Sequence, residues 1–103
     1  MESTPLVLQA IARKSCITGI YNGARFKLAP YILYTRNGGL YIDAVALVRD
    51  QTIPRDVKLG TFKLEGIKDL AIDDQMFEPQ LIYDASAEKY AGTKLFAVEG
   101  WPE

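Results

Sequence analysis

The sequence contains no histidine and a single cysteine, Cys16. A lone cysteine cannot form an intramolecular disulfide, and the common zinc sites and histidine-dependent catalytic pairs need residues that this chain lacks. The chain also has no glycine-rich phosphate loop and no nucleophile beside a base. We therefore expect no catalytic activity, no cofactor and no metal site. We expect Cys16 to be a small buried side chain in a reducing compartment.

Long apolar segments are absent too. No run of about 18 apolar residues could cross a membrane as a helix, and residues 1–5 lack the basic start and apolar stretch of a signal peptide. These absences favour a soluble, cytoplasmic protein without a membrane partner. The length of 103 residues indicates one domain, whose core can be large enough to fold without disulfides.

Charge is unevenly distributed along the chain. The formal net charge is −1, which argues against a protein that coats nucleic acid by charge alone. Residues 1–37, however, hold five basic and one acidic side chain, whereas residues 38–103 hold seven basic and twelve acidic ones. An anion-binding surface is therefore expected on the N-terminal half of the chain.

The first element expected is a short amphipathic helix over residues 4–14. Thr4 is in the position of an N-cap and Pro5 in the first helical position. Leu6, Ala10 and Ile11 recur at helical spacing and predict the buried face. We expect this helix to cover the open end of a sheet.

A β-hairpin is predicted next, because Asn22-Gly23 favours a two-residue turn. Such a turn pairs Tyr21 with Ala24 and continues to Ile17 opposite Leu28. Since side chains alternate across a strand, this register defines two faces. The expected core face carries Ile17, Tyr21, Phe26 and Leu28, and the outer face carries Thr18, Ile20, Arg25 and Lys27.

Further strands follow. A second hairpin at residues 35–41 joins residues 31–35 to residues 40–48, and Pro30 predicts a bend in the preceding strand. Residues 57–64 predict a fourth strand with Gly60 as a bulge, and the segment around Leu70 a short strand or helical turn. Asp84 is in position to cap a short helix, and residues 95–98 predict a last strand. This order indicates an all-β barrel or a small α+β domain.

Several of these segments, taken in order, resemble the WYL domain. The similarity begins with L-Q-A-I-A (residues 8–12) and continues through Tyr21, Arg25, Phe26 and Pro30. The Trp-Tyr-Leu that gives the family its name corresponds to L-Y-I (residues 40–42). F-K-L-E-G-I (residues 62–67) resembles the family's Phe-Arg-Leu-Asp-Arg-Ile, and Phe77 and residues 83–90 resemble its closing segment. The chain departs from the family at Leu40, Lys63 and Gly66, where the family has Trp, Arg and Arg.

The resemblance implies a mainly β fold: a small five-stranded Sm-like or SH3-type barrel over about residues 15–80. An N-terminal helix over about residues 4–14 precedes it, and a short C-terminal helix or extension in residues 81–103 follows. Its relatives sense ligands in bacterial transcription regulation and phage defence. In characterised relatives the ligand can be nucleic acid, often single-stranded, held by Tyr and Arg side chains.

The candidate binding residues are Arg25, Lys27, Tyr41 and Lys63. Cations beside an aromatic ring suit phosphate contact and base stacking. The alternative is that these cations provide solubility and discourage edge pairing. Tyrosines of a small barrel can equally fill the edge of the core, which we favour for Tyr21.

Two acidic features are weaker candidates for function. Asp43, within an apolar strand, is expected to mark its polar side or to pair with a base such as Arg25. Asp73 and Asp74 have no third ligand at suitable spacing and are expected to be solvated loop residues.

Two functions remain open from the sequence. One is a non-catalytic ligand-sensing or accessory domain that binds an anionic ligand, with single-stranded nucleic acid or a nucleotide as candidates. The other is a degenerate barrel that has lost ligand binding and acts in protein interaction or oligomerisation, as a homodimer or with another protein.

Overall fold

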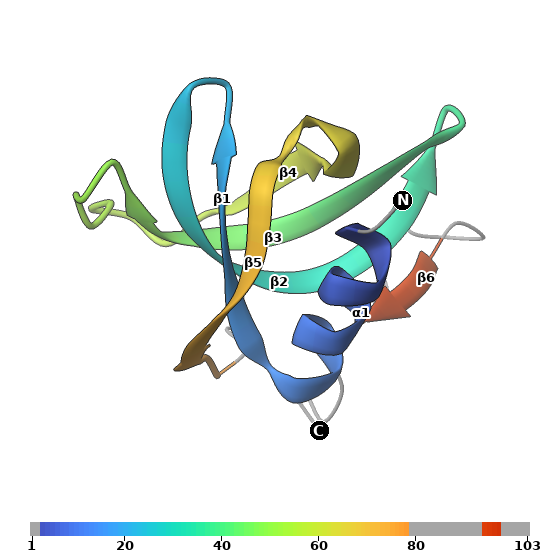
Figure 1. Ribbon diagram of the computed structural model, residues 1–103, viewed down its shortest axis with the longest axis horizontal. Helices are drawn as coiled ribbons and strands as arrows, with labels where there is room; N and C mark the ends of the chain where they lie inside the picture. Colours follow the sequence, from blue (N-terminus) through green and yellow to red (C-terminus); the bar gives the residue numbers. More distant parts are fainter. Residues whose placement is uncertain (1–2, 79–93, 98–103) are drawn as a thin grey trace.

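The computed structural model describes residues 3–78 and 94–97, which form one helix, six strands and a short 3-10 turn (Figure 1). The predicted helix after Asp84 lies outside these residues. In chain order the elements are α1 (Ser3–Arg13), β1 (Ser15–Tyr21), β2 (Ala24–Arg36), β3 (Gly39–Arg49), β4 (Leu59–Lys63), η1 (Leu64–Gly66), β5 (Lys68–Met76) and β6 (Lys94–Ala97).

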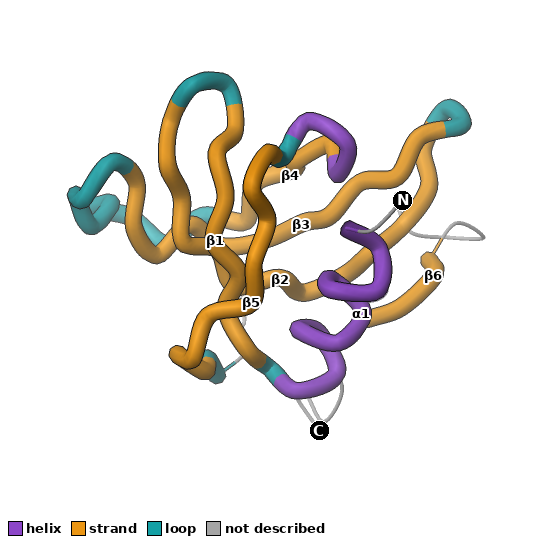
Figure 2. The backbone as a smooth tube through the Cα atoms, viewed as in Figure 1, coloured by secondary structure: helices purple, strands orange, loops and turns teal. Residues whose placement is uncertain are grey.

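All strands belong to one antiparallel sheet with the order β4-β3-β2-β1-β5, and β6 pairs with β2. The long β2 pairs with β3 along most of its length, with β1 through its first half and with β6 through its second half. Figure 2 shows these strands curving around one another, with α1 beside β2 and β5. The fold is mainly β with an N-terminal helix, as predicted. Among the described residues β4 and β5 end the sheet without pairing to each other, so the sheet is open.

The first hairpin has the predicted register. Tyr21 lies opposite Ala24 and Ile17 opposite Leu28. The turn residues Asn22 and Gly23 have φ angles of 50° and 80°, as a type I′ turn requires. The second hairpin uses the same turn chemistry at Asn37 and Gly38, with φ angles of 50° and 79°. Two Asn-Gly pairs therefore set the register of β1, β2 and β3.

The predicted bend at Pro30 is a break in the pairing of β2 with β3. Pro30 lies opposite Ala44 and Ile32 opposite Asp43, so Tyr31 is an additional residue between them. Such a bulge bends a strand and increases its twist. The bulge predicted at Gly60 is wrong, because β3 and β4 pair without a break from Tyr41 opposite Lys63 to Val45 opposite Leu59.

Helix α1 differs in detail from the prediction. It begins at Ser3, so Thr4 lies inside the helix and is not its N-cap. It ends at Arg13 because Lys14 has a φ of 56°, which a right-handed helix excludes. Its fully buried residues are Val7, Ala10 and Ile11, whereas the predicted Leu6 is half-buried. With 11 residues α1 is too short to span a bilayer, and the described residues contain no helix that could do so.

Gly19 allows β5 to approach β1 closely. A Cβ atom at this position would lie 2.5 Å from Cγ2 of Ile67 and 3.2 Å from the carbonyl oxygen of Lys68. The pairing of β1 with β5 is also interrupted by two register shifts. After β4 the chain turns through η1, and β5 then runs along β1. The close approach of the two strands requires glycine at position 19.

Candidate functional site

Tyr41 and Lys63 are direct cross-strand neighbours on β3 and β4. The Lys63 side chain is 45% exposed, and its Nζ lies 3.1 Å from Oε1 of Glu65. The hydrogen bond and negative charge of Glu65 raise the pKa of Lys63 above its ordinary value, so the amine stays protonated. Lys63, Glu65 and the second hairpin line a shallow hollow at this edge of the sheet.

The tyrosines of β2 and β3 have different environments. Tyr31 and Tyr34 are 1% and 0% exposed and belong to the core. Tyr31 stacks on Phe77, and Tyr34 stacks on Tyr41 with ring centroids 6.2 Å apart. Tyr41 itself is half-buried, so part of its surface remains available beside Lys63.

Tyr21 lies at the edge of the core, as predicted. Its ring contacts Phe62 edge-to-face, with centroids 5.1 Å apart. Its hydroxyl accepts a hydrogen bond of 3.1 Å from the backbone N–H of Lys63. Tyr21 therefore packs on the opposite side of the sheet from the Lys63 side chain and holds the backbone of that residue.

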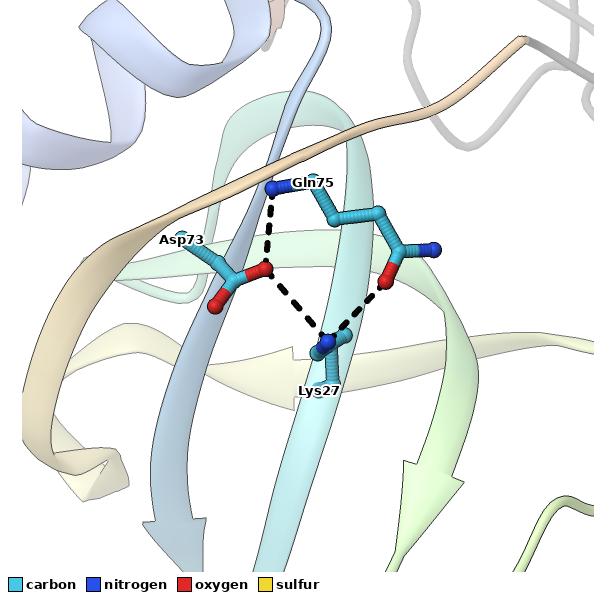
Figure 3. Close-up of polar contacts among 3 residues, drawn as sticks. All are labelled: Lys27, Asp73 and Gln75. Carbon is cyan, nitrogen blue, oxygen red and sulfur yellow. Dashed lines mark hydrogen bonds and ion pairs between the residues drawn. The ribbon is translucent and has the colours of Figure 1, made fainter.

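Lys27 lies on the outer face of the first hairpin and is already engaged (Figure 3). Its Nζ lies 3.4 Å from Oδ2 of Asp73 and donates a 2.9 Å hydrogen bond to Oε1 of Gln75. The backbone N–H of Gln75 also donates to Asp73, and this bond, together with Lys27, lowers the pKa of the Asp73 carboxyl. Asp73 and Asp74, expected in a loop, are residues of β5.

The Arg25 side chain is exposed, and the backbone of Arg25 is held by two hydrogen bonds to Asp50. Its N–H donates to Oδ1 of Asp50 at 2.9 Å, and its carbonyl oxygen accepts from the N–H of Asp50 at 2.8 Å. The guanidinium forms no ion pair with any residue that the structure describes. Arg25 and Lys27 line one hollow with Thr18, Val48 and Gln51.

The four predicted binding residues thus fall into two pairs. Tyr41 and Lys63 lie beside the second hairpin, and Arg25 and Lys27 beside the first. The hollow lined by Lys63 and the hollow lined by Arg25 and Lys27 share no residue.

Asp43 is buried and hydrogen-bonded to neutral side chains. Its Oδ1 accepts from the hydroxyl of Tyr34 at 2.7 Å and from that of Thr61 at 2.8 Å. Of the alternatives expected for Asp43, a pairing with Arg25 is not formed, because Arg25 is exposed on the outer face of the first hairpin while Asp43 is 1% exposed within the sheet. The carboxylate therefore links β2, β3 and β4 in the interior.

Cys16 is fully buried, as predicted. Burial, and to a lesser degree the charge of Asp73, raises the pKa of its thiol to about 11. A thiol with this pKa is almost entirely protonated at neutral pH and is a poor nucleophile. Within residues 3–78 and 94–97, no three His, Cys, Asp or Glu side chains gather in a way that would hold a metal ion.

A groove on the concave face of the sheet was not identified from the sequence. Its floor is formed by Phe26, Phe62 and three small residues, and its rim carries Arg49 and Lys58. Alternation had placed Phe26 in the core, where it does lie in part. The small side chains Ala44 and Ala46 of β3 are the sequence signal for this groove. That Gly60 of β4 faces Ala44 is known only from the strand register.

Comparisons of the chain with models of protein families, with curated proteins and with solved structures found no match.

Proposed function

We propose that the protein is a non-catalytic binding domain for an anionic ligand, with Tyr41 and Lys63 at the centre of the site. The observation that carries this proposal is their direct cross-strand pairing, which sets a protonated amine beside a partly exposed aromatic ring. An amine can contact a phosphate while the ring stacks on a base. Single-stranded nucleic acid and nucleotides are therefore the ligand class that fits best.

Arg25 and Lys27 supply a second cationic region on a different part of the surface. Two separated hollows, one with Lys63 and the other with Arg25 and Lys27, suit a chain that carries several phosphates better than a mononucleotide. Arg25 is the stronger contact in this pair, since Lys27 must first leave Asp73. On this basis we favour single-stranded nucleic acid as the ligand.

Membership of the WYL family, a closed barrel, a cytoplasmic location and a role in bacterial regulation or phage defence remain parts of the same proposal. The hydrogen bond from Lys63 to Tyr21 supports barrel-like curvature, because it joins the ends of β4 and β1. Gly66 stands at the position of a family arginine, and a Cβ there would lie 3.1 Å from Cε1 of Tyr21. The Tyr21 ring therefore occupies space that a larger residue would need.

The test is a fluorescence-anisotropy titration with a labelled single-stranded oligonucleotide at several salt concentrations. We expect binding that weakens as salt rises, and a loss of about tenfold or more in affinity for the Tyr41→Ala, Lys63→Ala double variant. Arg13→Gln is the matched control, since it removes one positive charge from the end of α1, outside both hollows. Absence of binding at low salt, or equal losses in the double variant and the control, would contradict the proposal.

The alternative function, a protein-interaction module, is favoured by a different observation. Ile53, Val57 and Met76 are exposed by 78%, 57% and 63%, and Val57 and Met76 line the same apolar cleft. Exposed apolar side chains that gather around a cleft are typical of interaction surfaces. Sedimentation velocity tests this alternative: it requires a stable dimer that Val57→Glu dissociates, and a monomer at all concentrations would contradict self-association.

A further inference from the structure

The groove on the concave face lies between β2, β3, β4 and the segment that connects β3 to β4. It encloses about 240 Å³. Phe62, in its floor, and Lys63 are adjacent on β4, so their side chains point to opposite faces of the sheet. The groove is therefore distinct from the proposed site at Tyr41 and Lys63.

The groove exists because small residues face one another across β3 and β4. Ala44 and Gly60 are cross-strand partners, and Ala46 is the next residue of β3 on the same face. A Cβ atom on Gly60 would lie 3.3 Å from Cε1 of Phe62, closer than an ordinary contact. The absence of a side chain at Gly60 therefore leaves the groove open and lets the Phe62 ring keep its position.

Two aromatic rings form the wall and floor of this space. Phe26 and Phe62 meet edge-to-face, with centroids 5.5 Å apart and ring planes at 74°. Such an arrangement offers an apolar surface shaped for a planar ring. The guanidinium carbon of Arg49 lies 5.6 Å from the centroid of the Phe26 ring, in cation–π geometry that leaves its N–H groups available.

The rim of the groove carries more positive than negative charge. Arg49 and Lys58 are both exposed, and neither forms an ion pair with any side chain in the described part of the molecule. Asp56 is the one acidic residue that lines the groove. An arginine above an aromatic floor, with a lysine nearby, presents donors for a carboxylate or phosphate at the edge of an apolar slot.

We propose that this groove binds a planar aromatic ring that carries an anionic group. The ring lies against Phe62 and Ala46, and the anion is held by Arg49 and Lys58. The enclosed volume suits one ring system with its substituent. Nucleoside monophosphates and aromatic carboxylates share this chemistry.

The experiment is an NMR titration of the ¹⁵N-labelled protein with adenosine 5′-monophosphate in one arm and 2-naphthoate in the other. We expect saturable shifts of the amides of Ala46, Gly60 and Phe62 with at least one probe. Adenosine and inorganic phosphate, which each supply half of the chemistry, should bind at least tenfold more weakly. Shifts with the nucleotide alone or with the naphthoate alone identify the source of the anion.

Three variants make the test specific. Ala46→Leu fills the groove without changing charge, and Arg49→Gln with Lys58→Gln removes both cations without filling it; each should weaken binding at least tenfold. Arg13→Gln, at the end of α1, should leave the affinity unchanged. Absence of saturable shifts at the groove with both probes, an unchanged affinity of both groove variants, or an equal loss in Arg13→Gln would overturn the proposal. Shifts confined to the amides of Tyr41 and Lys63 would also overturn it and would assign the probe to that site instead.

Discussion

The hydroxyl of Tyr21 accepts a hydrogen bond of 3.1 Å from the backbone N–H of Lys63. These residues end β1 and β4, which are separated in the sheet by β2 and β3. The bond therefore crosses the concave side of the sheet rather than following its ladder. It positions the backbone of the residue on which the proposed anion site depends.

Gly66→Ala tests how tightly this contact is packed. The new methyl would lie 3.1 Å from Cε1 of Tyr21, so the ring must shift and the bond to Lys63 must lengthen. We expect a loss of about 1 kcal/mol or more in the free energy of unfolding, measured by urea denaturation. Tyr21→Phe should lose about 0.5–1.5 kcal/mol through the missing hydrogen bond. Because both changes disturb one contact, the double variant should lose less than the two single losses together; full additivity would contradict this account.

Gly19→Ala should destabilise the protein more strongly. The added Cβ would meet Cγ2 of Ile67 at 2.5 Å and the backbone oxygen of Lys68 at 3.2 Å, and backbone moves less easily than a side chain. We expect a loss of about 1–3 kcal/mol in thermal or urea unfolding. Gly39→Ala is the matched control, since its Cβ would make only an ordinary contact, 3.4 Å from Cε1 of Tyr41. Equal stability of the two variants would show that β5 does not pack closely on β1.

Asp43→Ala should be the most harmful of the polar changes in the sheet. It removes the acceptor of both the Tyr34 and the Thr61 hydroxyl, and Tyr34 is fully buried. Leaving a buried donor unsatisfied lowers stability by about 1–3 kcal/mol. Tyr34→Phe and Thr61→Val, which remove one donor each, should be milder in urea denaturation. If Asp43→Ala were no worse than Thr61→Val, the network would have little structural role.

Cys16 should be inert in the folded protein and reactive in the unfolded one. Its thiol is buried with a pKa of about 11, against an ordinary value of 9.0, so little thiolate exists at pH 8. We expect slow reaction with Ellman's reagent in buffer and immediate reaction in concentrated urea. Fast labelling of the folded chain would contradict the buried position.

The same thiol makes the free energy of unfolding depend on pH. The sign is opposite to that of an Asp or Glu whose pKa is lowered on folding, because the pKa of Cys16 is raised. Because the pKa is higher in the folded state, the unfolded chain releases the proton first as pH rises from 9.0 towards 11. The contribution of the protonated thiol to the free energy of unfolding is therefore complete below about pH 9 and is lost as the pH rises from 9.0 to about 11. Urea unfolding of the wild type and of Cys16→Ala should show a steeper decline for the wild type; parallel curves would mean that the thiol does not titrate differently on folding.

The sequence predicted the hairpins well because their register is encoded locally. Asn22-Gly23 fixes which residues of β1 and β2 face each other, and hence which side chains are buried. The bend at Pro30, where Tyr31 is the additional residue, was likewise predicted from a local signal, the proline itself. The N-terminal end of α1 was predicted too late, because a capping preference at Thr4 does not exclude a helix that begins a residue or two earlier, and Ser3 is already helical.

The sites depended on contacts between distant segments, which local patterns do not contain. Lys27 meets Asp73 only because β1 lies between β2 and β5, and Asp43 meets Thr61 only through the register of β3 with β4. The concave groove has the same origin: Ala44 is an ordinary strand residue until Gly60 is known to face it. Overall charge gave no indication of this groove, because Arg49 and Lys58 belong to the acidic part of the chain.

The contact of Lys27 with Asp73 and Gln75 reaches over β1, since Thr18 of β1 pairs with Lys27 on one side and with Ala71 on the other. A phosphate that binds Lys27 must therefore exchange with a carboxylate of the protein itself. Because the pKa of Asp73 is lowered, this internal competitor stays charged well into the acidic range. The first hairpin thus already holds a carboxylate of its own at Lys27, and any other anion would have to displace Asp73 to contact this amine.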